Sequence, residues 1–264
     1  MRLPSASLIA SALGTTVRAL ERDWIGFDLP PPRIELAESG WSPDRPGAWC
    51  LRCGSGRPVT SRSSRGCPEC RGRSLPFDAI VRLGAYREPL DGWLLRIKRR
   101  RWHAMAEALG DLLAAQCREV WGPEPFDAVV PIPMPFLRRA WRGIDHSGML
   151  AARIAAAFRV PVERPLVHGG GRTQVGRSRT ERLRRRSPFR LDERAVRRCE
   201  SLGRVVLVDD VRSTGSTIRQ AARLLGERCS WLRIRAAVAA IAERGIRDVG
   251  QGAVQGLDFR PPTG

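Results

Sequence analysis

Lysine is almost absent from this sequence. Of its 46 Lys and Arg residues only Lys98 is a lysine, so arginine supplies nearly all of the positive charge. Such a ratio indicates a GC-rich genome more than selection for guanidinium chemistry. The formal net charge of +19 is still a physical property of the chain, and it favours polyanionic partners, either phosphate-rich small molecules or nucleic acid. A merely solvated basic surface is the alternative.

Long apolar runs are also missing. Ala236–Ala242 is among the longest, and it is far shorter than the roughly 20 residues of a membrane-spanning helix. The short apolar stretch Leu8–Leu13 has no clear cleavage site after it, so we interpret it as part of a helix rather than as a signal peptide. We therefore expect a cytoplasmic protein without a membrane span.

Apolar periodicity predicts an α/β fold. After an amphipathic helix over residues 5–24 and a linker rich in Pro, Gly and Ser over 29–46, strands are expected over 79–86, 128–132, 205–208 and 231–241. Between them, apolar spacing predicts a helix or helix pair over 94–112 and helices over 147–158 and 217–225. Strands that alternate with helices indicate a mostly parallel, doubly wound sheet.

Four cysteines follow a spacing that is typical of a metal site. Cys50, Cys53, Cys67 and Cys70 form two Cys-x2-Cys pairs with thirteen residues between them. Two such knuckles supply four thiolates for a tetrahedral, structural Zn²⁺, and this segment has too few apolar residues for a core of its own. Two disulfides or a redox dithiol are the alternatives. The other cysteines are interpreted as packing residues: Cys117, Cys199 and Cys229.

The most informative stretch is Val205–Thr217, VVLVDDVRSTGST. An apolar strand delivers Asp209 and Asp210 to its carboxyl end, where ligands of open α/β sheets bind. A turn of Ser, Thr and Gly then opens a helix, and its amides and hydroxyls can surround a phosphate. Because carboxylates beside a phosphate must serve sugar hydroxyls or a hard cation such as Mg²⁺, the pattern predicts a phosphorylated ribose. An ordinary capped helix is the alternative.

This stretch resembles the diphosphate-sugar signature of type I phosphoribosyltransferases. Asp127–Met134 with Arg138–Gly143 is similar to the Pro-x-Pro…Arg-Gly block of the ComF/GntX family, and Arg172–Gln174 with Ser187–Phe189 is similar to that family's next block. With the cysteine knuckles, the resemblance covers about residues 48–242. The family's usual Phe-Asn-Gln is replaced here by Ile144–His146.

The resemblance implies a type I phosphoribosyltransferase-like α/β fold, with a mostly parallel sheet, helices on both faces and a small N-terminal zinc-ribbon module. It implies that Asp209 and Asp210 hold the ribose as the catalytic acids. The phosphate would be bound by Ser213, Thr214, Gly215, Ser216 and Thr217. Candidates for the diphosphate, which Mg²⁺ accompanies, are Arg138, Arg142 and Arg172.

The expected organisation follows the same order. Residues 1–47 form a helix and linker, 48–75 the zinc-ribbon module, 76–110 a connecting strand and helix segment, 111–245 the phosphoribosyltransferase-like domain and 246–264 a tail. One functional hypothesis is an enzyme that binds phosphoribosyl diphosphate or a related phosphorylated ribose. The other, which the resemblance to the ComF/GntX family implies, is a non-catalytic accessory protein of DNA uptake in competent bacteria, with single-stranded DNA, a helicase or another DNA-processing protein as its partner.

Two basic segments have several interpretations. Arg172–Arg190 contains eight arginines in nineteen residues, which suit a loop closing over diphosphate, a disordered loop or contact with a nucleic-acid backbone. Arg96–Arg101 is flanked by Trp93 and Trp102. These tryptophans either clamp single-stranded nucleic acid or anchor helix packing. The three histidines show no ligand spacing, and among them only His146 is expected near the site.

Overall fold

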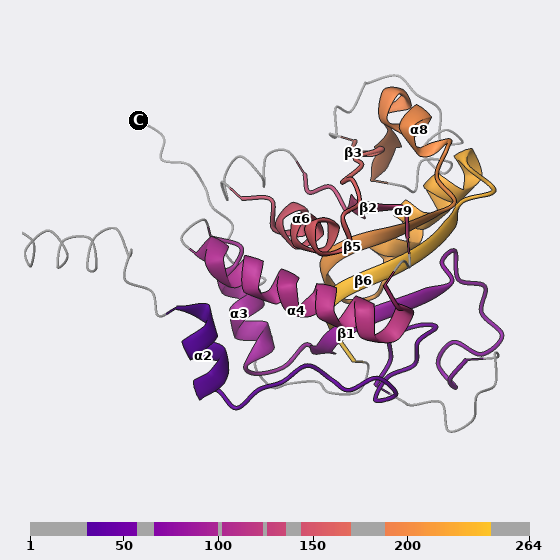
Figure 1. Ribbon diagram of the computed structural model, residues 1–264. Coiled ribbons are helices and arrows are strands. Elements are labelled where there is room, and N and C mark those ends of the chain that lie inside the picture. The colour runs from indigo at the N-terminus through magenta and orange to yellow at the C-terminus, as the bar shows by residue number, and fades with distance from the viewer. Residues whose placement is uncertain are drawn as a thin grey trace, which may run out of the picture.

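A parallel four-stranded sheet forms the centre of the molecule (Figure 1). The computed structural model describes residues 31–56, 66–99, 102–123, 126–135, 144–169 and 188–243. The strand order is β1-β6-β5-β2, and each neighbouring pair is parallel. The strands are β1 (Ala79–Ala85), β2 (Ala128–Pro131), β5 (Arg204–Arg212) and β6 (Arg233–Ile241). The predicted mostly parallel α/β fold is therefore confirmed.

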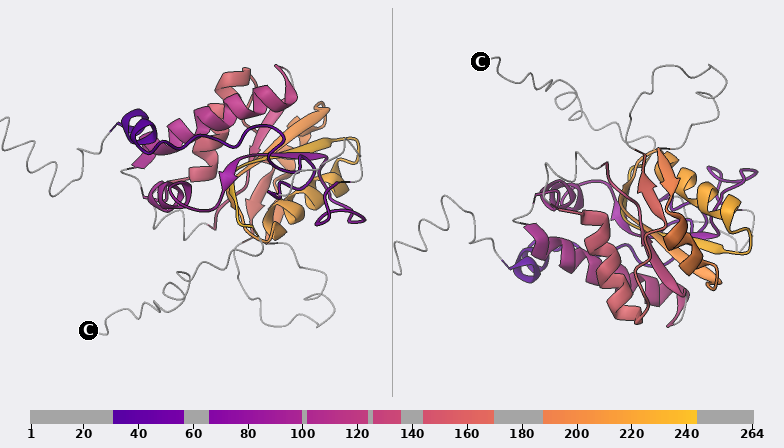
Figure 2. Two further views of the ribbon diagram at one scale, coloured as in Figure 1. Left: turned by 90° about the horizontal axis from the view of Figure 1, so that it is seen from below. Right: turned by 90° about the horizontal axis from the view of Figure 1, so that it is seen from above.

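Helices cover both faces of this sheet, as expected (Figure 2). One face is covered by α3 (Leu90–Arg96), α4 (His103–Trp121) and α6 (His146–Phe158), and the other by α8 (Glu193–Cys199) and α9 (Ser216–Arg228). Side chains of β5 alternate between the two cores: Val206 and Val208 face the first, Val205 and Leu207 the second. A strand buried on both faces reads as a continuous apolar run, and this explains the pattern in the sequence.

A small antiparallel hairpin stands beside the main sheet. It pairs β3 (Leu166–His168) with β4 (Phe189–Leu191), and the side chains of Leu166 and Phe189 are buried in the second core. The end of the arginine-rich segment is therefore a strand, although its sequence shows no apolar periodicity. The remainder of that segment, residues 170–187, lies outside the described residues.

The linker predicted over residues 29–46 is wrong in part, because Pro32–Glu38 form helix α2. A proline suits the first turn, where its missing N–H leaves no hydrogen bond unmade. Glu35 then accepts a hydrogen bond from Nε1 of Trp93 at 2.8 Å, and Trp41 packs edge-on against Trp93. These tertiary contacts stabilise a helix that is too short to be stable alone. The helix predicted over residues 5–24 lies outside the described residues.

The segment that leads into the first cysteine pair runs along the outer edge of β1. The backbone N–H of Asp44 donates to the carbonyl of Leu83, and that of Ile80 donates to Leu51, both at 2.7 Å. Nε1 of the buried Trp49 also donates to the carbonyl of Ile80, at 3.2 Å. The edge strand of the sheet is therefore covered by irregular chain rather than by another strand.

Arg82 fastens this segment to the sheet. Its side chain extends from β1 and is 4% exposed. The guanidinium pairs with Asp44 at 2.7 Å and with Glu243 at 2.8 Å, and it donates to the carbonyl of Gly54 at 3.0 Å. These contacts join the predicted zinc-ribbon module to the predicted connecting segment. The division of the chain into domains stays a prediction.

Candidate functional site at the carboxyl ends of the strands

The two adjacent acids lie near the carboxyl end of β5, inside the strand rather than after it. The sequence predicts a strand over 205–208, but β5 continues to Arg212 because β6 pairs with it along this extension. Strand β2, on the other side, ends at Pro131, opposite the residue before Asp209. From Asp209 onward, β5 therefore has no strand paired with it on the side of β2. Asp209 and Asp210 lie at this unpaired part of the strand.

A cleft of about 310 Å³ lies at this part of β5. The acid pair and Thr217, at the start of α9, form part of its polar wall. Phe189 and His168 of the β3–β4 hairpin line it with Ile132 and Met134, which follow β2. The cleft therefore has a polar half at the acid pair and a largely apolar half at the hairpin, at the edge where open α/β sheets bind ligands.

Asp210 lies between a histidine and a lysine side chain. Its Oδ2 lies 3.3 Å from Nε2 of His146, at the start of α6, and 3.6 Å from Nζ of Lys98, after α3. The other oxygen accepts a hydrogen bond from the backbone N–H of Val211 at 2.8 Å. The carboxylate is thus fixed in orientation, and Lys98 adds a positive charge at the wall of the cleft.

Asp209 is buried like its neighbour, with 9% of the residue exposed against 8% of Asp210. Its Oδ1 accepts hydrogen bonds from Oγ of Ser147 at 3.1 Å and from the backbone N–H of Asp210 at 3.0 Å. Burial and, after it, the charge of Asp210 raise the pKa of Asp209 well above its usual value of 3.8. A carboxyl group of this kind gains from a ligand that donates hydrogen bonds to it, such as a sugar with free hydroxyls.

The loop after β5 turns sharply at Gly215. This residue has φ +71°, a left-handed conformation that glycine adopts without strain, and it precedes the first residue of α9. As the N-cap residue it has no side chain that could cap α9, and the capped-helix alternative names Ser213 or Thr214 for this role. Oγ1 of Thr214 instead accepts from the N–H of Ser216 at 3.3 Å and donates to its Oγ at 3.0 Å.

The predicted phosphate-binding residues do not all face the same space. Thr217 lines the first cleft with the two acids, whereas Ser213 and Thr214 line a second cleft of about 200 Å³ between α9 and the cysteine segment. The roles of these residues stay predictions. Three further candidates lie outside the described residues: Arg138, Arg142 and Arg172.

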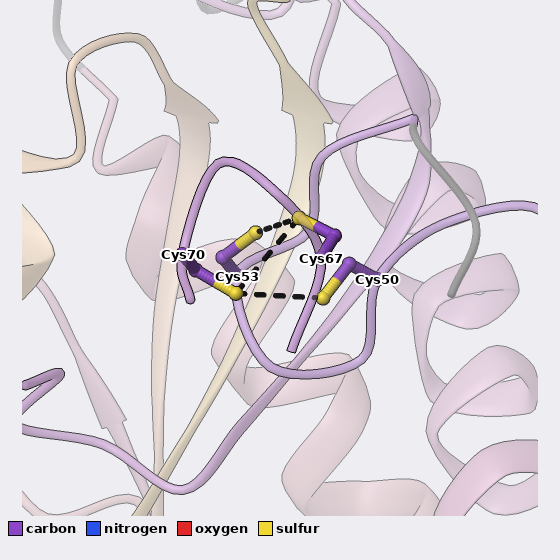
Figure 3. Close-up of side chains that lie close together, drawn as sticks. All are labelled: Cys50, Cys53, Cys67 and Cys70. Carbon is purple, nitrogen blue, oxygen red and sulfur yellow. Dashed lines mark hydrogen bonds between the residues drawn. The ribbon is translucent and has the colours of Figure 1, made fainter. Parts of the chain in front are cut away.

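The four predicted metal ligands come together at one point. Figure 3 shows their sulfur atoms directed toward one another from two knuckles. The sulfurs lie within 4.8 Å of one another, with Cys50 to Cys70 and Cys67 to Cys70 at 3.8 Å and Cys53 to Cys67 at 3.5 Å. A tetrahedron with metal–sulfur bonds of about 2.3 Å has edges of about 3.8 Å. The residues therefore fit a structural metal ion, and none of them forms a disulfide.

The pKa values of three of these cysteines also bear on metal binding. A hydrogen bond shared with Cys50 and burial raise the pKa of Cys53, and burial raises that of Cys70. Cys50, which accepts the hydrogen bond of Cys53, has its pKa lowered to about 4. The raised pKa values oppose the loss of protons from Cys53 and Cys70, so the four thiolates of a metal site would need the charge of the metal in order to form. The scattered cysteines are buried packing residues, as expected: Cys117, Cys199 and Cys229.

Known proteins are similar to this chain over most of their length. Competence protein F of Haemophilus influenzae is 26% identical over 181 residues, which are 67% of this chain and 78% of that protein. The DNA utilization protein YhgH of Escherichia coli K12 is 30% identical over 183 residues, which are 67% of this chain and 77% of that protein. The chain belongs to the ComF family. No family model matches the sequence.

One solved structure resembles part of this ComF-family chain. It is the glutamine phosphoribosylpyrophosphate amidotransferase from B. subtilis complexed with ADP and GMP, with a TM-score of 0.36 and 25% sequence identity. The likeness covers 51% of this chain and 26% of that one. In the part of the ComF-family chain that the structure describes, no helix has the length and apolar character needed to cross a bilayer.

The departure from the ComF sequence pattern at Ile144–His146 has a structural account. Asp145 caps α6, where its Oδ1 accepts from the N–H of Gly148 at 3.0 Å, and its Oδ2 pairs with Arg164 at 3.0 Å. It is therefore a helix cap, while His146 enters the cleft and contacts Asp210.

Lys98 and Ser147 line the cleft, although the sequence pattern did not identify them as cleft residues. The one available signal was that Lys98 is the only lysine. The packing interpretation of the tryptophans is confirmed, because Trp93 is 1% and Trp102 8% exposed. The Arg96 guanidinium covers the Trp102 ring at 4.5 Å, so neither indole offers a face for stacking bases. Arg100 and Arg101 lie outside the described residues.

Proposed function

We propose that this ComF-family protein binds a phosphorylated ribose of the phosphoribosyl-diphosphate type in the first cleft. The observation that carries the proposal is the position of Asp209 and Asp210, two buried acids at the wall of a cleft that also contains Thr217 at the N-terminus of α9. Acids that accept hydrogen bonds from ribose hydroxyls, next to a helix N-terminus that favours a phosphate, match the two ends of such a ligand.

The surroundings of the acids support sugar binding over direct metal binding. Oδ2 of Asp210 already faces His146 and Lys98, and Oδ1 of Asp209 already accepts two hydrogen bonds. We infer that Mg²⁺ enters with the diphosphate, where it would neutralise the charge of a departing diphosphate. Lys98 adds a positive charge from the protein. Arg138, Arg142 and Arg172 remain the proposed diphosphate ligands.

Isothermal titration with phosphoribosyl diphosphate and Mg²⁺ at low salt tests this proposal. We expect binding to the unaltered protein and none to Asp209→Ala/Asp210→Ala. A matched control, Glu107→Ala/Asp111→Ala, removes the same charge from the exposed surface of α4 and should bind normally. If the unaltered protein does not bind, the proposal is wrong. If the unaltered protein does bind, its consumption of phosphoribosyl diphosphate in the presence of a panel of acceptors separates phosphoribosyl transfer from binding alone.

We propose zinc as the metal of the cysteine cluster, because four thiolates in a closed tetrahedral set are the ligands that structural Zn²⁺ prefers. Its role would be to fold the segment around Cys50 and Cys67 and to hold it against the sheet. Metal analysis of protein purified under reducing conditions should give one zinc per chain. Less than about half an equivalent would contradict the proposal.

A second candidate function is a role in DNA uptake, with or without catalysis. The observation that favours it is the similarity to proteins named for competence and for DNA utilization. The net charge of +19 suits a polyanionic partner, and a cytoplasmic location is part of the same proposal. Fluorescence anisotropy with labelled single-stranded DNA should show affinity that falls with salt. Absence of binding at low salt would exclude direct DNA contact and leave a protein-only adaptor for a helicase or another DNA-processing protein.

A further inference from the structure

We propose that His146 is a positioning residue for the acid pair and makes ligand binding in the first cleft depend on pH. This role rests on the proposed function, because it requires the ribose site. His146 is the first residue of α6 and is 5% exposed, and its Nε2 lies 3.3 Å from Oδ2 of Asp210. Both side chains line the first cleft. Protonation of the imidazole therefore places a positive charge at the wall of the cleft, in contact with one of the two acids.

The start of α6 contacts both acids of the pair. His146 contacts Asp210, and Oγ of the next residue, Ser147, donates to Oδ1 of Asp209 at 3.1 Å. The helix is itself fixed, because it packs against β5. Only the histidine contact changes its charge between about pH 8 and pH 5, the range in which imidazoles titrate. Ser147 therefore holds Asp209 across this range, whereas Asp210 is held more strongly where the imidazole is charged.

A third charged group faces the same carboxylate. Nζ of Lys98, in the connection after α3, lies 3.6 Å from the oxygen of Asp210 that His146 contacts. Burial and, after it, the charge of Asp210 raise the pKa of Asp209, so Asp209 carries less negative charge as pH falls. One carboxylate does not balance two cations. The excess positive charge attracts an anion such as a diphosphate into the cleft.

Two further acids belong to α6 and to α4, which packs along it. Asp145, the N-cap of α6, pairs with Arg164 at 3.0 Å. Asp111 of α4 pairs with Arg153 at 2.7 Å, about two turns beyond His146 on α6. An aspartate that is paired with an arginine keeps its charge between about pH 8 and pH 5. These pairs therefore contribute equally at both ends of the range.

Other titratable side chains lie near the cleft or elsewhere in the chain. Burial, above all, raises the pKa of Tyr86, so its phenol is neutral below its usual value of 10. His168 lines the first cleft from the hairpin and titrates in the same range as His146, so the experiment must separate the two. The third histidine of the chain, His103, is exposed at the start of α4 and does not line the cleft.

The test is isothermal titration with phosphoribosyl diphosphate and Mg²⁺ at about pH 8 and about pH 5.5, on either side of the histidine range. It compares the unaltered protein with His146→Gln and with His168→Gln, a matched loss of an imidazole from the same cleft. We expect His146→Gln to bind equally well at the higher pH and about fivefold more weakly at the lower, since it gains no charge near the diphosphate. His168→Gln should follow the unaltered protein at both. Because all three proteins contain Asp209 and bind the same ligand, ratios of their dissociation constants report on the histidines.

A second measurement needs no ligand. Imidazole NMR signals of the three histidines, assigned from the variants, are followed against pH in the unaltered protein and in Asp210→Asn. Loss of the carboxylate charge should move the titration of His146 to lower pH and leave that of His168 in place. A titration of His146 that does not move, or an affinity ratio of His146→Gln to the unaltered protein that is the same at both pH values, overturns the positioning role and leaves the ribose site intact. Absence of binding by the unaltered protein overturns the proposed function, and the role of His146 with it.

Discussion

Gly54, beside the cysteine cluster, is where the knuckle meets the sheet most closely. It has φ +81°, and a Cβ added to it would overlap Cδ1 of Ile241 at the end of β6 and lie 3.2 Å from Cγ2 of Ile80. We predict that Gly54→Ala lowers the free energy of unfolding by about 2–5 kcal/mol. About 1–2 kcal/mol comes from the left-handed backbone, and about 1–3 kcal/mol from overpacking against the isoleucines.

Two further variants separate these contributions. Gly72→Ala has the same backbone cost at φ +75°, but its Cβ would meet nothing within 4 Å, so we expect a loss of only about 1–2 kcal/mol. Ile241→Val removes the atom that the new Cβ would overlap, at its own cost of about 0.5–1.5 kcal/mol. The double variant Gly54→Ala/Ile241→Val should therefore be more stable than the sum of the single losses, by about 1–2 kcal/mol.

Urea unfolding of metal-loaded, reduced protein, followed by tryptophan fluorescence, measures all four free energies. The buried Trp49 lies next to the knuckle and reports on its release from the sheet. If Gly54→Ala and Gly72→Ala lose the same stability, or if Ile241→Val does not rescue Gly54→Ala, then the first knuckle does not pack against β6 in the way described, and the reasoning from this contact fails.

Three other outcomes are expected. Asp209→Asn keeps the acceptor oxygen but removes an acid whose pKa is raised by folding. It should therefore raise the melting temperature near neutral pH, and the gain should vanish as pH falls below 3.8; a gain that persists there would contradict the raised pKa. Lys98→Met should weaken phosphoribosyl diphosphate binding about tenfold in isothermal titration, and unchanged affinity would remove Lys98 from the site. Removing the metal with a chelator should lower the melting temperature in calorimetry, and an unchanged value would show that the cysteines do not need it.

The sequence was sufficient to predict those parts of the site that depend on residues close together in the chain. The spacing of Cys50, Cys53, Cys67 and Cys70 was sufficient to predict their convergence, because two knuckles of this kind can satisfy one metal. The strand that carries Asp209 was predictable from its apolar run. Its true end was not, since aspartate disfavours strands and only pairing with β6 extends β5 to Arg212.

Residues that reach the cleft from distant segments could not be predicted. Ser147 lies 62 residues before Asp209 in the chain and meets it because α6 packs against β5. Lys98 reaches Asp210 from the connection between α3 and α4. Helix α2 depends on tertiary contacts such as the hydrogen bond from Trp93 to Glu35, which no local pattern shows. In each case a tertiary contact decided the structure.

The segment in front of Cys50 has a consequence for assembly. It occupies the outer edge of β1, whose N–H and C=O groups would otherwise be open to strand addition by another molecule. This cover leads directly into the knuckle, where the N–H of Cys50 donates to the carbonyl of Ser55. Loss of the metal would therefore loosen the segment before Cys50 and expose the edge of β1, to which a strand of another molecule could add. The cysteine cluster would therefore protect the edge of β1 by holding the segment that covers it. Self-association should rise as metal is lost, even before the rest of the protein unfolds.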